Sequence, residues 1–267
     1  MQCAFSPMIQ EGMSSSPADQ LAMLKREAEK TLLMISPYLR PGMRVLEIGG
    51  GIGLTYAALL NMDIDVTSLE PGDQGFGDRH RAGFRFCKIL GVDPRGWVKA
   101  GIEEYPFQKQ GYDLVFSFFV LEHIQNLNQA FRVMAGNLRP KGVMVHRCPN
   151  YSVPFEPHFN IPLVPFFPRW TAHLRPWLRK SPVWNGLRFT TTGGIKRLCA
   201  RHGLRPVFRK GLIATALEQV LDDPLFASRK RMFIKSAGLL RKTKLLVLLH
   251  RTPAAWNTPM EFLASKV

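Results

Sequence analysis

Short apolar runs alternate along this chain with stretches in which apolar residues recur every three or four positions. The runs at 45–48, 64–69, 97–100, 112–116 and 143–147 predict buried parallel strands. Helical spacing predicts helices over 17–35, 54–60, 78–90, 124–138, 190–203 and 213–221. Further strands are expected at 207–208 and at 244–250, which would be the last one. This alternation predicts an α/β fold with a doubly wound, mostly parallel seven-stranded sheet.

The alternation breaks between 149 and 188, where eight prolines and three tryptophans leave no regular spacing. A long proline-rich segment inside an α/β fold is typical of a functional insertion. We therefore expect four regions: an N-terminal tail and helix (1–40), a core (41–150), a lid (151–188) and the C-terminal half of the sheet with a basic extension (189–267).

Charge is distributed very unevenly between the two parts of the chain. Residues 1–168 carry 16 basic and 16 acidic side chains, whereas residues 169–267 carry 20 basic and four acidic ones, so the net charge of +16 belongs to the last 99 residues. Such asymmetry favours an anionic partner, namely a nucleic acid, an acidic lipid surface, or a phosphorylated or acidic glycan. A basic surface that only aids solubility is the other interpretation.

Four cysteines lie far apart, without a zinc-binding spacing, so we expect reduced thiols and no metal site. The first residues lack the charged and apolar segments of a signal peptide. The apolar run 245–249 is far shorter than the ~20 residues of a membrane span. A cytoplasmic protein is expected.

The strongest motif is Glu47-Ile48-Gly49-Gly50-Gly51-Ile52-Gly53, between a predicted strand and a predicted helix. Glycines there let the backbone turn sharply and approach a ligand near the amides of a helix N-terminus. The spacing matches neither a dinucleotide fingerprint nor a phosphate-binding P-loop. Glu70 ends the second predicted strand, a position from which an acid commonly binds ribose hydroxyls.

In these segments, and in YDLVFSFFVLEHI and LRPKGVMVHRCPN, the chain resembles the class I S-adenosylmethionine-dependent methyltransferases. The resemblance implies a Rossmann-like fold with S-adenosylmethionine as cofactor. No N-P-P-[YF] motif follows the fourth predicted strand, which argues against N-methylation of adenine or glutamine amides, and no cysteine pair suits a 5-methylpyrimidine mechanism. The resemblance further implies that the cofactor's amino acid part is held by Glu47 and the backbone of Gly49, Gly51 and Gly53, and its ribose by Glu70. It also implies that Ser117 and Phe118 lie beside the methionine moiety. Gly101 stands where relatives often have Asp, so the adenine contacts are expected from Ile102 and Glu103.

Methyl transfer to a hydroxyl is faster when a base takes the hydroxyl proton, by ~10²–10⁴-fold. His158 in the lid is the first candidate base, with Glu156 near enough to orient it. His123, which follows Glu122, is the second, but the resemblance favours a structural or cofactor-side role for this Glu-His pair. His146, in the middle of a strand, is interpreted as a core residue. Polar groups expected in the acceptor pocket are Asn150, Tyr151, Glu156 and Asn160.

The acceptor is left open by the sequence. A small-molecule, lipid-linked or glycan hydroxyl suits the aromatic lid, with Phe155, Phe159, Phe166, Phe167, Trp170 and Trp177. Segment 228–251 mixes basic and apolar residues and could contact an anionic membrane peripherally. The alternative is an RNA methyltransferase that uses the basic region as a phosphate track, which we disfavour because no separate RNA-binding module is present. A non-catalytic binding protein is disfavoured by the intact Glu47, glycine and Glu70 set.

Overall fold

The computed structural model describes residues 17–72, 78–108, 111–223 and 234–267. Its main element is a seven-stranded sheet in the order β3-β2-β1-β4-β5-β9-β8. The strands are β1 (Arg44–Ile48), β2 (Asp65–Leu69), β3 (Trp97–Val98), β4 (Tyr112–Phe118), β5 (Leu138–Cys148), β8 (Leu204–Phe208) and β9 (Met260–Lys266). β9 runs antiparallel to both of its neighbours, and the other pairings are parallel. The predicted mostly parallel α/β sheet is confirmed.

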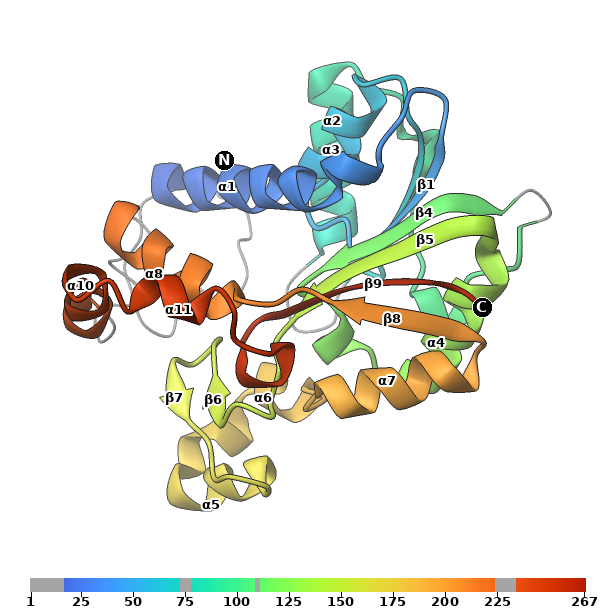
Figure 1. Cartoon of the computed structure of the whole chain (residues 1–267). Coiled ribbons are helices and arrows are strands. Elements are labelled where there is room, and N and C mark those ends of the chain that lie inside the picture. Colours follow the sequence, from blue (N-terminus) through green and yellow to red (C-terminus); the bar gives the residue numbers. More distant parts are fainter. Residues whose placement is uncertain (1–16, 73–77, 109–110, 224–233) are drawn as a thin grey trace.

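Helices cover both faces of the sheet (Figure 1). On one face lie α1 (Pro17–Ile35), α2 (Leu54–Leu60) and α3 (Arg79–Leu90), which bury Ile35, Leu59 and Cys87 against the strands. On the other face lie α4 (Leu127–Asn137) and α7 (Thr192–Arg201), which bury Phe131 and Ile195. Each amphipathic helix thus places its apolar stripe on the sheet, and the two cores keep the carboxyl ends of the strands in fixed positions.

The last strand differs from the prediction. Residues 244–250 do not form a strand, because Leu246–Leu249 is a short helix, α11. The strand that closes the sheet is β9, whose residues Met260, Phe262 and Ala264 are buried between β5 and β8. The apolar run 245–249 satisfies its backbone within one helical turn instead, and it leaves several of its side chains at the surface.

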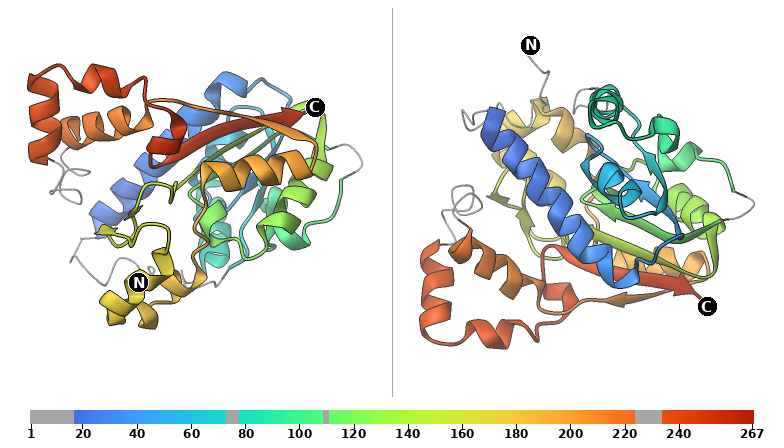
Figure 2. Two further views of the ribbon diagram at one scale, coloured as in Figure 1. Left: turned by 60° about the horizontal axis from the view of Figure 1, so that its bottom comes forward. Right: turned by 90° about the horizontal axis from the view of Figure 1, so that it is seen from above.

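Of the 20 basic residues in 169–267, ten lie between β8 and β9 and five lie in the lid. Between β8 and β9 the chain forms α8 (Leu212–Asp222), α10 (Ile234–Lys242) and α11, which we call the basic insertion. Figure 2 shows it as a separate group of helices beside the sheet. Met232 and Phe233 belong to the segment that was expected to contact a membrane. They lie outside the described residues. In the described residues, no helix combines the length and the hydropathy that crossing a membrane requires.

The lid follows β5 and consists of short elements. They are the hairpin of β6 (Phe155–Glu156) and β7 (Ile161–Pro162), then α5 (Thr171–Leu174) and α6 (Pro182–Gly186). The lid has a small apolar core of its own, with Leu178, Trp184 and Leu187 almost wholly buried. This core, and not long helices or strands, stabilises the proline-rich backbone of the lid. The lid sequence therefore has no helical or strand periodicity.

Candidate functional site: a glycine loop facing a histidine-bearing lid

The glycine-rich loop lies between β1 and α2, at the carboxyl end of the sheet. Gly49, Gly51 and Gly53 have φ values of +77°, +61° and +84°, a conformation that favours glycine strongly. A Cβ on Gly49 would lie 2.4 Å from Cγ2 of Val120, in the segment after β4. The loop therefore packs directly against the residues that lead to Glu122 and His123.

Two buried carboxylates lie beside this loop. Glu47 accepts a hydrogen bond from Oγ of Ser68 at 2.6 Å, and burial raises the pKa of Glu47 to about 7. Glu70 accepts one from the Gly51 N–H at 2.8 Å, and burial raises its pKa as well. Buried carboxylates are stabilised by donors or cations. The site thus fits a ligand that brings an ammonium group and hydroxyl donors, as S-adenosylmethionine does.

The residues predicted around the rest of the cofactor occupy neighbouring strand ends. Ile102 is buried, and Oε1 of Glu103 accepts a hydrogen bond from the Asn126 N–H at 2.6 Å, just before α4. Oγ of Ser117 is paired with Nδ1 of His146 at 2.7 Å. Contact of Ser117 with a cofactor would therefore use its backbone. The cofactor contacts expected from Ile102, Glu103, Ser117 and Phe118 remain predictions.

His146 is a core residue, as the sequence suggests. It is fully buried in the sheet, and burial lowers its pKa to about 3. Its ring packs on Phe262 with centroids 5.3 Å apart.

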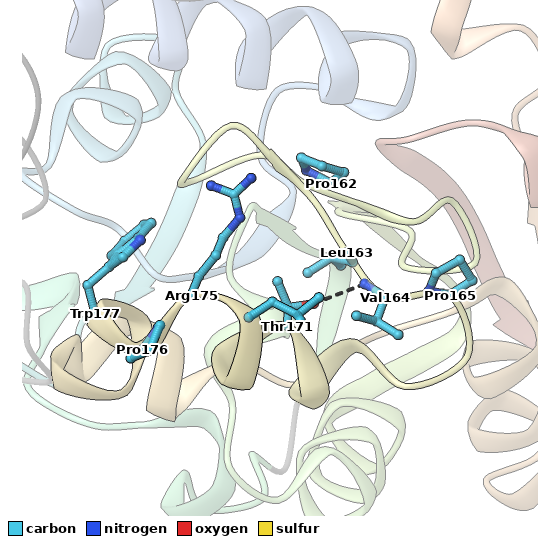
Figure 3. Close-up of a pocket in the computed structure, with 9 residues that line it drawn as sticks. Pro162, Leu163, Val164, Pro165, Thr171, Arg175, Pro176 and Trp177 are labelled. Atoms are coloured by element: carbon cyan, nitrogen blue, oxygen red, sulfur yellow. Dashed lines mark hydrogen bonds between the residues drawn. The ribbon is translucent and has the colours of Figure 1, made fainter.

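A groove runs along the lid (Figure 3). It has a volume of about 640 Å³ and is lined by Pro162, Leu163, Val164, Pro165, Thr171, Leu174, Arg175, Pro176 and Trp177. The lining is mostly apolar, with the Arg175 guanidinium as its charged group. Beyond its lining, the ring of Trp177 contacts Phe159 with centroids 5.6 Å apart.

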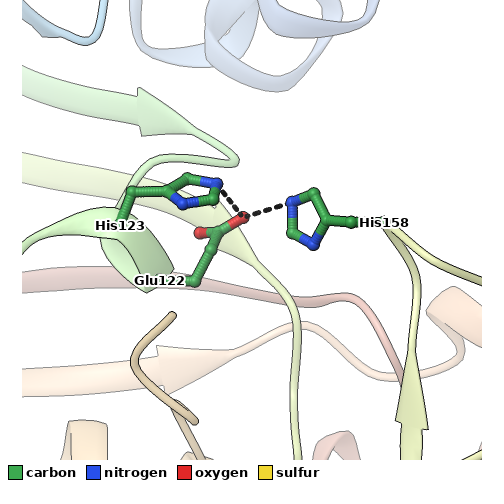
Figure 4. Close-up of side chains that lie close together, drawn as sticks. All are labelled: Glu122, His123 and His158. Carbon is green, nitrogen blue, oxygen red and sulfur yellow. Dashed lines mark ion pairs between the residues drawn. The ribbon is translucent and has the colours of Figure 1, made fainter. Parts of the chain in front are cut away.

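The lid brings His158 to the end of β4 (Figure 4). Nε2 of His158 and Nε2 of His123 each lie 3.9 Å from Oε1 of Glu122, and the two imidazole rings are 5.1 Å apart. On its other side, Nδ1 of His158 lies 2.5 Å from Oε1 of Glu156. The predicted pairing of His158 with Glu156 is thus present, and the structure adds the pairing of His158 with Glu122 across the site.

Burial sets the protonation of this cluster. Glu122 is fully buried, and desolvation raises its pKa to about 7. Desolvation and the neighbouring His158 lower the pKa of His123 to about 3. His123 is therefore neutral and a weak proton acceptor at pH 7, because a general base works best with a pKa near the operating pH. Of the two histidines predicted as bases, His158 is the one that a carboxylate, that of Glu156, orients.

The predicted substrate-binding residues lie behind the histidine. Glu156 is fully buried and accepts hydrogen bonds from the Tyr151 hydroxyl at 3.1 Å and from the Phe159 N–H at 2.7 Å. Both contacts hold the carboxylate that orients His158. Asn160 is partly exposed with φ +56°. A direct contact of Tyr151, Glu156 or Asn160 with an acceptor remains a prediction.

Asn150 does not fit the predicted role of a pocket residue. Its side chain is fully buried and donates to the backbone carbonyls of Ala254, Ala255 and Asn257 at 3.2, 3.0 and 2.9 Å. It fastens the start of the lid to the segment before β9. An amide followed by a tyrosine gives no sequence signal that distinguishes such a role from substrate binding.

Glu122 is the functional candidate that sequence reasoning missed. Its sequence signal is weak, because Glu122 stands next to His123 in a turn that begins after β4 has ended. Together Glu122, His123 and His158 offer three ligand atoms within 4.8 Å of one another, a donor set suited to a divalent cation. Removal of metal ions with a chelator therefore tests the expectation that the site uses no metal.

Comparison with known proteins identifies the family of the chain. A family model described as "Methyltransferase domain" matches residues 21–207. The chain belongs to this methyltransferase family. It is a transferase that uses S-adenosylmethionine as cofactor, as the resemblance implied.

Among curated proteins, the uncharacterized protein Rv1509 of Mycobacterium tuberculosis is 30% identical over 205 residues, which are 73% of this chain and 69% of that protein. The biotin biosynthesis bifunctional protein BioHC of Cellvibrio japonicus is 28% identical over 131 residues, 49% of this chain and 24% of that protein. Neither likeness names an acceptor for this methyltransferase.

Solved structures share the fold. Geranyl diphosphate C-methyltransferase from Streptomyces coelicolor A3(2), in complex with Mg²⁺, geranyl diphosphate and S-adenosyl-L-homocysteine, has a TM-score of 0.60 at 14% identity, covering 98% of this chain and 90% of that one. Phosphoethanolamine N-methyltransferase 2 of Haemonchus contortus, in complex with S-adenosyl-L-methionine, has a TM-score of 0.55 at 15% identity and covers 89% of this chain. The methyltransferase spans about half, 52%, of that longer protein.

Proposed function

We propose that this methyltransferase methylates a hydroxyl oxygen of a small-molecule, lipid-linked or glycan acceptor, with His158 as the general base. The observation that carries the proposal is the His158–Glu156 pair at the end of β4, next to the segment that packs on Gly49. A histidine oriented by a buried carboxylate is an arrangement suited to taking a proton from a hydroxyl.

Each residue has a stated task. When bound beside Glu47, Glu70 and the glycine loop, the cofactor supplies an electrophilic methyl group. His158 accepts the hydroxyl proton at Nε2, since Nδ1 is held by Glu156. Loss of that proton would make the hydroxyl oxygen the nucleophile for the methyl group that a bound cofactor would supply. The lid positions the acceptor, and this proximity contributes much of the rate.

Peripheral contact with an anionic membrane belongs to the same proposal. Support comes from the basic insertion, where α11 leaves Leu245, Val247 and Leu248 exposed among basic residues. A surface that mixes exposed aliphatic and basic side chains suits a bilayer interface, where the apolar side chains enter the headgroup boundary and the basic ones face acidic lipids.

The test is a label-partition assay with methyl-labelled S-adenosylmethionine and a whole-cell extract, separated into lipid, small-molecule, glycan, nucleic-acid and protein fractions. We expect label in one of the first three fractions, as an alkali-stable methyl ether. His158→Ala should lower the rate ~10²–10⁴-fold with unchanged cofactor affinity. His202→Ala, which changes a histidine at the end of α7 paired with Asn128, is the matched control. Label released by nuclease would overturn the proposal in favour of an RNA methyltransferase.

A further inference from the structure

The outer face of the lid is covered by large apolar side chains. Five of them lie within twelve residues and are exposed by 47 to 95%: Phe166, Phe167, Trp170, Leu174 and Trp177, here called the lid face. Single exposed apolar residues are normal, but a group of this size in one short segment marks an interaction site. The sequence suggested that these aromatic residues surround the acceptor, whereas Phe166, Phe167 and Trp170 point outward.

The exposure of the lid face is not a failure of the lid to fold. The lid core buries Leu178, Trp184 and Leu187, and the guanidinium of Arg169 donates to the backbone carbonyls of Trp184 and Leu187 at 3.2 and 2.7 Å. The sequence thus provides two apolar sets in one segment. One forms the interior, and the other stays in solvent.

Charge around the lid face identifies the partner. Residues 157–188 contain five basic residues and no acid. Arg179 and Lys180 are exposed directly after Trp177, and Arg175 lies between Leu174 and Trp177. Tryptophan and phenylalanine bordered by arginine and lysine are typical of surfaces that enter the headgroup region of an anionic bilayer.

The groove is continuous with this face, since Leu174 and Trp177 belong to both. In Figure 3 the Arg175 side chain extends toward Pro162 across the groove. A hydrocarbon chain in the groove would lie against Trp177, whose ring contacts Phe159. The groove and the face therefore suit the two parts of a lipid, its chain and its anionic headgroup.

We propose that the lid face docks on an anionic lipid bilayer and that the adjoining groove takes a hydrocarbon chain of a lipid. Docking stands independently of the chemistry at His158; the groove's role rests on the proposed function, because it assumes a lipid-linked acceptor.

Docking is tested by sedimenting the full chain with vesicles of phosphatidylcholine, with and without phosphatidylglycerol. The double variant Phe166→Ser with Trp170→Ser should lose binding to the anionic vesicles by at least about tenfold, given the apolar area removed. The matched control is Leu33→Ser with Ile89→Ser, which changes two exposed apolar residues elsewhere and should bind as wild type. Equal binding of both double variants would overturn the proposal.

Two further measurements separate the alternatives. If Val247→Ser with Leu248→Ser abolishes vesicle binding and the lid variant does not, the membrane contact belongs to the basic insertion and the lid proposal fails. If light scattering shows a dimer that the lid variant converts to a monomer, the lid face binds a second copy, which also overturns it.

The groove is tested with vesicles of phosphatidylglycerol brominated along its chains. Bromine should quench wild-type tryptophan fluorescence, and Trp177→Phe should reduce that quenching. Unchanged quenching in the variant would exclude chain entry. Neither readout needs methyl transfer, so failure of the proposed O-methylation would leave docking unaffected.

Discussion

Nδ1 of His158 lies 2.5 Å from Oε1 of Glu156, two residues earlier in the same lid hairpin. The contact fixes the ring so that Nε2 points toward Glu122 and the end of β4. Since Glu156 is itself held by Tyr151 and the Phe159 N–H, the orientation of His158 is set before any acceptor binds.

Replacing this carboxylate tests its positioning role. Glu156→Gln keeps the shape but removes the charge that holds the imidazole, and we expect kcat to fall by ~10²-fold or more while cofactor affinity stays unchanged. Glu156→Asp should recover part of kcat. Steady-state kinetics and calorimetric binding of the cofactor check this. An increase in acceptor KM alone would show instead that Glu156 binds the acceptor directly.

Glu122 should make stability depend on pH. Its pKa in the folded protein is about 7, above the ordinary 4.5, so the folded state holds a proton that the unfolded chain releases. That contribution is fully present below pH 4.5 and is lost as the pH rises to about 7. Glu122→Gln should flatten the fall in unfolding free energy over this range, an effect on the order of 1–3 kcal/mol. Urea denaturation across the range measures it, with the exposed Glu104→Gln as control. Parallel curves for Glu122→Gln and wild type would contradict this.

Asn150 should matter for stability. Asn150→Ala leaves three backbone carbonyls near residues 254–257 without their donor, at a cost of about 2–4 kcal/mol in unfolding free energy. Urea denaturation checks this, and cofactor binding to the folded variant should be preserved. Wild-type stability with lost methyl transfer would restore Asn150 to the acceptor pocket.

The glycine loop offers a paired test of shape. Gly49→Ala would bring a methyl group within 2.4 Å of Val120, so we expect cofactor affinity to fall by about 100-fold or more. Gly91→Ala introduces the same left-handed strain at the end of α3, with nothing within 4 Å of the new Cβ. It should cost only about 1 kcal/mol of stability and leave binding intact. Equal binding by both variants would mean that the loop adapts.

Removal of metal ions tests the role of the histidines. With His158 as the base, protein dialysed against a chelator should keep its methyl-transfer rate. A loss of activity that zinc or manganese restores, together with bound metal by elemental analysis, would make Glu122, His123 and His158 ligands instead.

The sequence by itself determined the alternating framework and the position of the glycine loop. Buried strands such as 45–48 have short apolar runs, and a loop that needs three left-handed residues needs glycines, so both leave local signals. Glu70 also leaves a local signal, because it directly follows a buried strand.

Tertiary structure decided the last strand, the lid and the catalytic neighbourhood. The pattern of segment 244–250 predicts a strand, but Met260–Lys266 is the strand that pairs with β5 and β8. That pairing is non-local, so the local pattern does not determine it. Which lid aromatics are buried depends on packing of Leu178, Trp184 and Leu187, which proline-rich sequence does not reveal. The approach of His158 to Glu122 joins residues 36 positions apart and follows from the lid folding back over β4. Long-range contacts of this kind have no periodicity in sequence, because they are fixed by the shape of the whole core.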